Sequence, residues 1–436
     1  MIFQNFPAGI FGVGAIFGGL LSAYLGNQYG RKMSLILLAI PDLLGWILVA
    51  SSQNLGMMLA GRFLGGFAAA GYSPNIQIYV GEITQPQHRG WMSGLTVPIT
   101  AIGVLIMYVV GSILPWHLAA ASCSPTPIMM VVCLMFYWDS PYWYAHIGKE
   151  KSAHQALEQF RGSDINSEAE MFQIFEYIRG DSESVWFLEG LAKLFTEKKY
   201  LKPFAILNCL FLLMLFSGKF AIDFYAVEIV KHFEGSMNEY LSVVIIAFIS
   251  LIGSLSYIPL VKRFSRKILL CFSAFVMGIS LVLLGMCMYS HTSHSLSVLS
   301  DCDWLPMICI VSYMVSAPMG LCSIPFIYIS EFYPSEVAMA GYSNYYSSLF
   351  LFQMRSLMGG LTIAISNLEL FIVVKTFPNL EYLMGDHGVF WLYAFACFGA
   401  IVFTLSYIPE TKDKVLTKVT LILFAPCEDF YNSGGE

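Results

Sequence analysis

Three ionisable side chains interrupt an apolar stretch in the middle of the sequence. Lys219, Asp223 and Glu228 all lie within "FSGKFAIDFYAVE", which runs from Phe216 to Glu228. If the stretch is helical, Lys219 and Asp223 share one face, because residues four apart are neighbours on a helix. A lone charge at the centre of a bilayer costs about 2.5–3.5 kcal/mol on insertion scales, so the two groups must pair or face water. The spacing favours a wet ion pair over a dedicated binding site.

The elements that position this stretch follow from composition. Of the 436 residues, 57% are hydrophobic and only 12% are charged, whereas a soluble domain carries about 25% charged residues. The apolar residues come in blocks of about 20, the length that crosses a bilayer as a helix, and helices satisfy their own backbone groups in lipid. The fold class is therefore an all-α polytopic membrane protein.

Eleven membrane spans are predicted, and one long polar interval divides five of them from six. Amphipathic pieces such as "KEKSAHQALEQF" predict short surface helices in that interval. The predicted domains are a helical bundle at 1–137, a loop at 138–201, a second bundle at 202–418 and a tail at 419–436. The predicted spans are 8–26, 33–52, 55–80, 92–114, 118–137, 203–226, 239–261, 268–289, 304–330, 340–373 and 388–408.

Basic residues fall on one side of these spans. Arg31, Lys32 and Arg89, the 138–201 loop and the cluster at 262–267 share that side, and Lys and Arg favour the cytoplasm. We expect the central loop and the C-terminus inside, and a multi-pass protein of the plasma membrane. The odd number of spans then puts Met1 outside, and we expect that one further helix precedes it.

Several function classes find no support in the sequence. A formal charge of −6 argues against a nucleic-acid partner, and the ten cysteines form no CxxC pair. No nucleophile–base pair, metal-ligand cluster or nucleotide-binding loop is recognisable, so we expect no enzyme activity, no metal and no cofactor. The lipid bilayer is an expected partner, and the oligomeric state is left open.

Two short basic loops repeat, "LGNQYGRK" at 25–32 and "VKRFSRK" at 261–267, which is typical of two homologous helical bundles. Five further motifs follow in a set order: "GRFLGGFAAAG" (61–71), "YVGEITQPQHRG" (79–90), "DSPYWYAHIGKEKSA" (139–153), "IPFIYISEFYP" (324–334) and "IPETKDKVL" (408–416). From residue 9 to about 418 the chain resembles the sugar porters of the major facilitator superfamily, above all the facilitative hexose and trehalose transporters.

The resemblance implies a major facilitator fold and facilitated diffusion of a small polar solute, a hexose or trehalose, by alternating access. Uniport is the simpler expectation, while proton coupling stays open. The alternative is a degenerate, non-transporting relative that acts as a sensor.

The resemblance also implies a set of ion pairs that latch the two bundles. The matching residues are Arg31, Glu82, Arg89, Arg266, Glu331 and Glu410. Alternatively, these charges only set topology, which is the preferred interpretation for Arg31 and Lys32 alone, while the latch is preferred for Glu82 with Arg89. Several family partners are replaced, by Asn27, Gln28, Lys262 and Ala338, so we expect a weakened latch.

The implied sugar site is altered as well. Where the family carries hydrogen-bonding amides, this chain has Val97, Met214, Leu215 and Phe220, and each unmade buried hydrogen bond costs about 1–3 kcal/mol. This argues against high-affinity glucose binding.

Other expected contacts with the solute remain: Asn344, Tyr345, Pro325, and Phe326 in place of a Trp. Asn344 is equally well explained as a helix-packing residue. Lys219 and Asp223 either line the cavity of a changed, more ionic site or form the compensated pair described above.

The tenth predicted span, 340–373, is too long for one crossing. "FLFQMRSLMGGLTIA" at 350–364 resembles an insertion and puts Arg355 in apolar surroundings. It is either a re-entrant segment or a mis-spliced piece, and the second is preferred.

Overall fold

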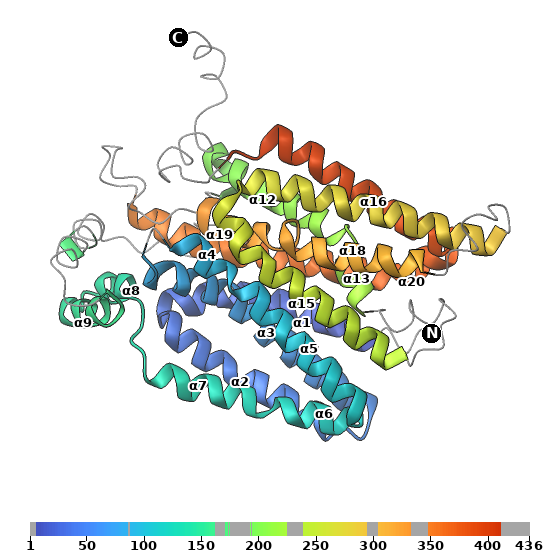
Figure 1. Cartoon of the computed structure of the whole chain (residues 1–436). Helices are drawn as coiled ribbons and strands as arrows, with labels where there is room; N and C mark the ends of the chain where they lie inside the picture. The colour runs from blue at the N-terminus through green and yellow to red at the C-terminus, as the bar shows by residue number, and fades with distance from the viewer. Residues whose placement is uncertain are drawn as a thin grey trace, which may run out of the picture.

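A computed structural model shows how these helices are arranged. It describes residues 6–85, 88–161, 171–172, 174, 192, 194–224, 239–293, 304–332 and 348–410. Within these residues all regular structure is helical (Figure 1). This agrees with the all-α class expected from composition.

The first half of the chain forms nine of the described helices. They are α1 (Phe6–Gln28), α2 (Arg31–Ala50), α3 (Leu55–Ile83), α4 (Arg89–Gly94), α5 (Thr96–Ile113), α6 (Trp116–Cys123), α7 (Pro125–Met135), α8 (Pro141–His146) and α9 (Glu150–Arg161).

The second half contains the remaining described helices. They are α12 (Lys198–Leu215), α13 (Lys219–Phe224), α15 (Glu239–Arg263), α16 (Arg266–Ser293), α18 (Leu305–Met319), α19 (Ile324–Phe332) and α20 (Ser348–Tyr407). The last is bent at Gly385, whose φ of 70° is a left-handed conformation that glycine adopts freely.

Ten helical stretches among the described residues are long and apolar enough to cross a membrane. The one predicted span without such a stretch is 55–80, which corresponds to α3, a helix of 29 residues. It contains Arg62, Asn75, Gln77 and Glu82, and these polar residues lower its mean hydropathy. The polytopic membrane class is therefore confirmed, and α3 is a long but more polar helix.

The predicted span 340–373 lies too far toward the N-terminus. The structure places the apolar crossing at Leu357–Gly385, followed by a second one at His387–Tyr407. The helix continues past residue 373 and through Pro378, and the first non-helical backbone conformation within it is the turn at Gly385. Residues 350–364 are part of this continuous helix, so they form no re-entrant segment, and Leu357 and Ile363 are buried. The side chain of Arg355 lies outside the described set.

The first half is held together by close helix contacts at glycines. A Cβ added to Gly14 or Gly18 of α1 would overlap the backbone of α3 at Phe63 or Phe67. Small residues four apart let two membrane helices approach backbone to backbone. The sequence "GAIFG" therefore sets the packing of α1 on α3.

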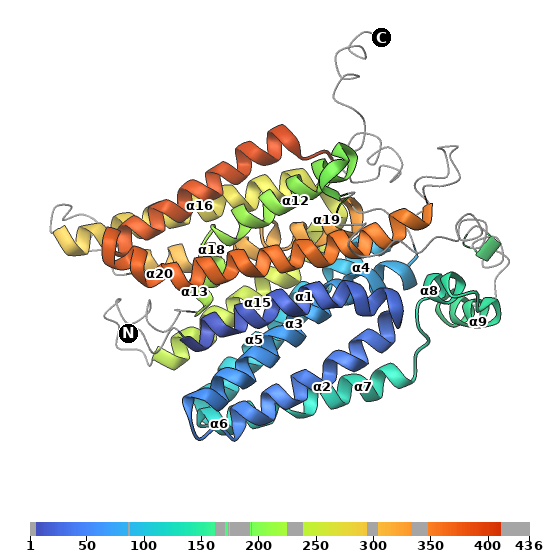
Figure 2. The ribbon, with the colours of Figure 1, turned by 180° about the vertical axis from the view of Figure 1, so that it is seen from behind.

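The two halves repeat one packing scheme. In the first, α3 contacts α1 and α2; in the second, α18 contacts α15 and α16. Across the seam between the halves, α1 packs on α20 and α5 packs on α15 (Figure 2). If α1 corresponds to α15 and α5 to α20, the contact of α1 with α20 is the counterpart of the contact of α15 with α5. Two like-built bundles are thus present, while the domain limits at 137, 201 and 418 stay predictions.

The helix ends gather at two opposite ends of the bundle. The α1–α2 turn, α4, the α15–α16 turn, α8 and α9 lie at one end, which we name the α8–α9 end (Figure 1). The opposite end includes α6 and the bend within α20. The basic loop residues of both halves therefore share one end, as the spans predicted.

Candidate functional site

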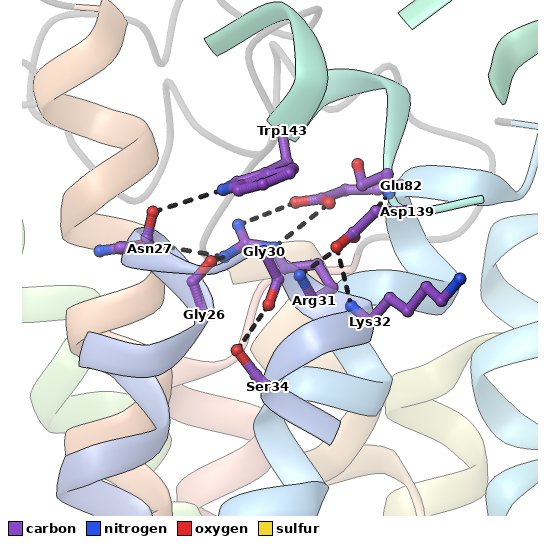
Figure 3. A network of polar contacts seen from close by, with 10 residues as sticks. Gly26, Asn27, Gly30, Arg31, Lys32, Ser34, Glu82, Asp139 and Trp143 are labelled. Carbon is purple, nitrogen blue, oxygen red and sulfur yellow. Dashed lines mark hydrogen bonds and ion pairs between the residues drawn. The ribbon is translucent and has the colours of Figure 1, made fainter. Parts of the chain in front are cut away.

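A buried ion pair joins α2 to α3 at the α8–α9 end. The Arg31 guanidinium donates from Nη2 to Glu82 Oε1 at 3.1 Å and from Nε to Oε2 at 3.3 Å. The two side chains are 1% and 2% exposed. Parallel bonds of this kind between a guanidinium and a carboxylate are strong and directional. The pair fixes the start of α2 against the end of α3 (Figure 3).

Asp139 completes this network from the segment between α7 and α8. Its carboxylate accepts hydrogen bonds from the backbone N–H groups of Arg31 and Lys32, at 3.0 and 3.1 Å. These are the first N–H groups of α2, which have no partner within the helix, and a negative charge is favourable there. Burial raises the pKa of this carboxyl, against the lowering effect of the Ser140 and Lys32 N–H groups and of Arg31. Asp139 therefore caps the N-terminus of α2.

The α1–α2 turn and α8 join the same network. Arg31 Nη1 donates to the carbonyl of Gly26 at 2.8 Å, and the Trp143 indole N–H donates to the carbonyl of Asn27 at 3.4 Å. Gly30, with φ of 90°, makes the turn, and a Cβ there would overlap Asp139 and Trp143. Figure 3 shows these groups converging on Arg31.

The latch that the family resemblance implies for Glu82 with Arg89 stays a prediction. The Arg31–Glu82 pair itself lies within one bundle, since both residues belong to the first half. The reason is that α2 begins where α3 ends, so the opposite charges meet inside one bundle. The pair acts as an internal clamp of that bundle. The side chains of Arg89 and Glu331 lie outside the described set, and their role stays a prediction.

The second half repeats part of this network. Arg266 Nη1 donates to the carbonyl of Val261 at 3.3 Å, five positions back, as Arg31 does to Gly26. The backbone N–H of Lys267 donates to Glu410 at 3.4 Å, as that of Lys32 does to Asp139. Glu410 thus corresponds to Asp139, a residue that the sequence reasoning did not single out. The shared signal was an acid shortly after the last span of each half.

The expected ion pair between Lys219 and Asp223 is confirmed. Lys219 Nζ lies 2.6 Å from Oδ1 and 2.5 Å from Oδ2, and the side chains are 12% and 37% exposed. The pair follows a break between α12 and α13 at Gly218, whose φ is 88°. A Cβ at Gly218 would overlap the Tyr393 ring. The break therefore needs glycine and places the pair on a separate short helix.

The replaced amide positions do not gather into a polar site. Met214 and Leu215 are 1% and 2% exposed within the core of the second half, and Phe220 packs against that core. Val97 lies half-exposed on α5 in the other half. Apolar side chains are more stable in the core than in a wet passage. Met214 and Leu215 are therefore core residues in this conformation, and their contact with a solute stays a prediction.

The remaining predicted solute contacts are divided. Pro325 is buried and Phe326 is half-buried on α19, where the Phe326 ring packs edge-on against Phe211 with centroids 5.1 Å apart. Asn344 and Tyr345 lie outside the described residues. Among the residues that the structure describes, no group of three His, Cys, Asp or Glu side chains could hold a metal ion.

Comparison with known proteins identifies the family. The profile of the family described as "Sugar (and other) transporter" matches residues 4–423. The chain belongs to this transporter family. Its members are transporters rather than enzymes, as the motif order indicated.

Two curated fly proteins illustrate the relation of this sugar transporter family member to others. It is 29% identical over 415 residues to the facilitated trehalose transporter Tret1-2 homolog of Drosophila sechellia, covering 95% of this chain and 81% of that protein. It is also 29% identical to trehalose transporter 1 of Drosophila melanogaster, covering 95% of this chain and 46% of that longer protein.

Solved structures share the fold of this family member. The proton:xylose symporter XylE bound to 6-bromo-6-deoxy-D-glucose superposes with a TM-score of 0.80 at 20% identity, covering 97% of this chain and 89% of that chain. The partially occluded inward-open form of XylE from E. coli gives a TM-score of 0.73 at 19% identity, covering 94% and 88%. The major facilitator fold is confirmed.

Proposed function

We propose that this transporter carries a hexose or a disaccharide such as trehalose down its concentration gradient, by alternating access between the two halves. Its family and its relatives named as facilitated trehalose transporters support a sugar as the solute. The observation that carries the mechanism is the repeated packing of the halves across one seam, α1 on α20 and α5 on α15. Two like-built bundles can rock about such a seam.

The path of the solute is proposed to run past the Lys219–Asp223 pair. The pair is partly exposed, and it stands on the short helix after the break at Gly218. Phe326, Asn344 and Tyr345 are the proposed solute contacts, since an aromatic face can stack on the C–H face of a sugar. The burial of Met214 and Leu215 predicts weak binding, because fewer hydroxyls find partners.

The α8–α9 end is proposed to face the cytoplasm, and the protein is proposed to reside in the plasma membrane. The basic residues at this end support the orientation, because Lys and Arg favour the cytoplasmic side. A cysteine introduced at Lys149, an exposed position before α9, should react with an impermeant thiol reagent only after the cells are opened. Reaction in intact cells would reverse the orientation.

Transport is tested with the purified full-length chain in liposomes. Labelled trehalose and glucose are offered separately, and uptake should saturate and should be reduced by the same unlabelled sugar. Liposomes without protein provide the baseline. If correctly inserted protein shows no saturable uptake of either sugar, the proposed solute class is wrong.

A further inference from the structure

Among the described residues, a cation–π contact and a hydrogen bond cross the seam between the halves, one near each end of the bundle. At the α8–α9 end, Lys262 Nζ lies 4.3 Å from the ring centroid of Trp91. Trp91 belongs to α4 in the first half and Lys262 to the last turn of α15 in the second. An ammonium over an indole face is attracted by the negative face of the ring.

The surroundings of Trp91 favour this contact. The His88 ring meets the indole edge-on with centroids 6.0 Å apart, which fixes the ring plane. Gly94 brings α4 close to α15, because a Cβ there would lie only 2.7 Å from the ring of the buried Tyr257. Lys262 stands where the family resemblance predicts an acid. An acid would be repelled by the ring face, so the exchange to lysine fits the contact.

The second contact lies toward the opposite end, where Figure 1 places α13. The Tyr108 hydroxyl on α5 donates to the backbone carbonyl of Asp223 at 3.1 Å. That carbonyl is among the last of α13, and the last four carbonyls of a helix have no partner within it. The side chain of Asp223 is meanwhile held by Lys219. The ion pair therefore orders the short helix whose end Tyr108 binds.

We propose that Lys262 with Trp91 and Tyr108 with Asp223 are the two gate contacts of the transport cycle. The proposal rests on the proposed alternating access, in which a solute passes between the halves only when one end of the seam parts. Opening at the α8–α9 end separates Lys262 from Trp91, and opening at the opposite end separates Tyr108 from Asp223. Each contact stabilises the closed form of its own end, so its loss shifts the population toward opening there.

This assignment predicts effects of opposite sign. Trp91→Ala or Lys262→Met should loosen the α8–α9 end and, because both ends do not open together, should tighten the opposite end. Tyr108→Phe, which removes only the hydroxyl, should do the reverse. Trp91→Phe retains a ring face and should resemble the unaltered protein. Contacts of this strength shift such a population by about two- to five-fold.

Hydrogen–deuterium exchange of the full-length protein in lipid nanodiscs tests this without any solute. Peptides from α4 and the end of α15 report on one end, and peptides from α13 and the end of α5 report on the other. Matched controls away from these contacts are Trp116→Ala, Lys149→Met and Tyr382→Phe, all at exposed positions. Lys262→Met provides the measurement at the α8–α9 end if Trp91→Ala does not fold.

The expected result is faster exchange at the altered end with slower exchange at the other, and partial cancellation in Lys262→Met with Tyr108→Phe. Faster exchange at the altered end alone would mean local packing and would overturn the proposal. Identical patterns for the two ends would overturn it as well. Since no sugar is present, failure here is separate from failure of the uptake assay, which tests the transported solute.

Discussion

The carboxylate of Asp139 accepts a hydrogen bond from the backbone N–H of Arg31, a residue 108 positions earlier in the chain. A second bond from the Lys32 N–H makes Asp139 the partner of the start of α2. Hydrogen bonds to a charged carboxylate are stronger than those between neutral groups. Removal of this carboxylate would also leave two buried N–H groups without a partner, which costs stability.

Asp139→Ala should lower the free energy of unfolding by about 1–3 kcal/mol. Asp139→Asn should lower it less, because its amide oxygen still accepts one bond. Thermal unfolding in detergent measures both. Glu158→Gln, at an exposed position on α9, is the matched control and should leave the midpoint unchanged. Equal loss for the two Asp139 variants would contradict the bonding described.

Breaking the Arg31–Glu82 pair from one side should be costly. Either Arg31→Met or Glu82→Leu leaves a buried charge without its main partner, which typically costs about 3–5 kcal/mol. The double variant should recover much of the loss, since no uncompensated charge remains. A double-mutant cycle on unfolding free energies measures the coupling. Simple additivity of the two losses would show that the pair is not a unit.

Gly30→Ala and Gly148→Ala separate backbone strain from crowding. Both glycines have positive φ, 90° and 73°, so both substitutions incur the left-handed cost of roughly 1–2 kcal/mol. At Gly148 nothing lies within 4 Å of an added Cβ, whereas at Gly30 the methyl overlaps Asp139 and Trp143. Gly30→Ala should therefore unfold at the lower temperature, and equal midpoints would argue against crowding at the turn.

The Lys219–Asp223 pair can be tested for function and for folding together. Lys219→Ala should reduce sugar uptake and the yield of inserted protein, because it leaves Asp223 without its partner. A lone charge in the membrane costs about 2.5–3.5 kcal/mol of insertion free energy. Lys219→Met with Asp223→Leu should restore yield. If uptake also returns, the pair serves only folding; if it stays low, the pair belongs to the solute path. Unchanged uptake in Lys219→Ala would end the functional interpretation.

Acid should weaken the packing of α8. Burial, with the nearby Arg31 charge, lowers the pKa of His146 below its usual 6.5, so this side chain stays neutral to a lower pH in the folded protein than in the unfolded chain. The unfolded chain takes up a proton near pH 6.5, so stability is full above that pH and falls as the pH drops below it. Unfolding midpoints at pH 7.5 and 5.5 should differ, and His146→Gln should reduce the difference. If the midpoints of His146→Gln at the two pH values differ as much as those of the unaltered protein, other groups cause the acid effect.

Local relations were predictable from the sequence and distant ones were not. Lys219 and Asp223 are four apart, so helix geometry alone pairs them. Asp139 and Arg31 are far apart in the chain, and their bond requires the packing of α2, α3 and α8. The contact between Lys262 and Trp91 depends in addition on how the halves dock.

Burial and helix length in the second half do not follow from motif order. The motifs put Met214 and Leu215 at positions of the expected solute site, and the structure shows their apolar side chains in the core. The predicted span stops at residue 373, whereas the helix continues to the turn at Gly385. Lys375 interrupts the apolar run of the sequence but not the helix. Burial and backbone continuity decided both cases, and neither follows from motif order.

Glycine gives α1 two smooth sides. On one side Gly14 and Gly18 contact the backbone of α3; on the other, an added Cβ at Gly12 or Gly19 would lie 2.9 Å from Phe371 or 3.1 Å from Ala364 of α20. At these glycines α1 has no side chain that could interdigitate with those of α3 or α20. In the proposed alternating access, α20 therefore meets no side chain of α1 at Gly12 or Gly19 that would have to repack when the two halves move.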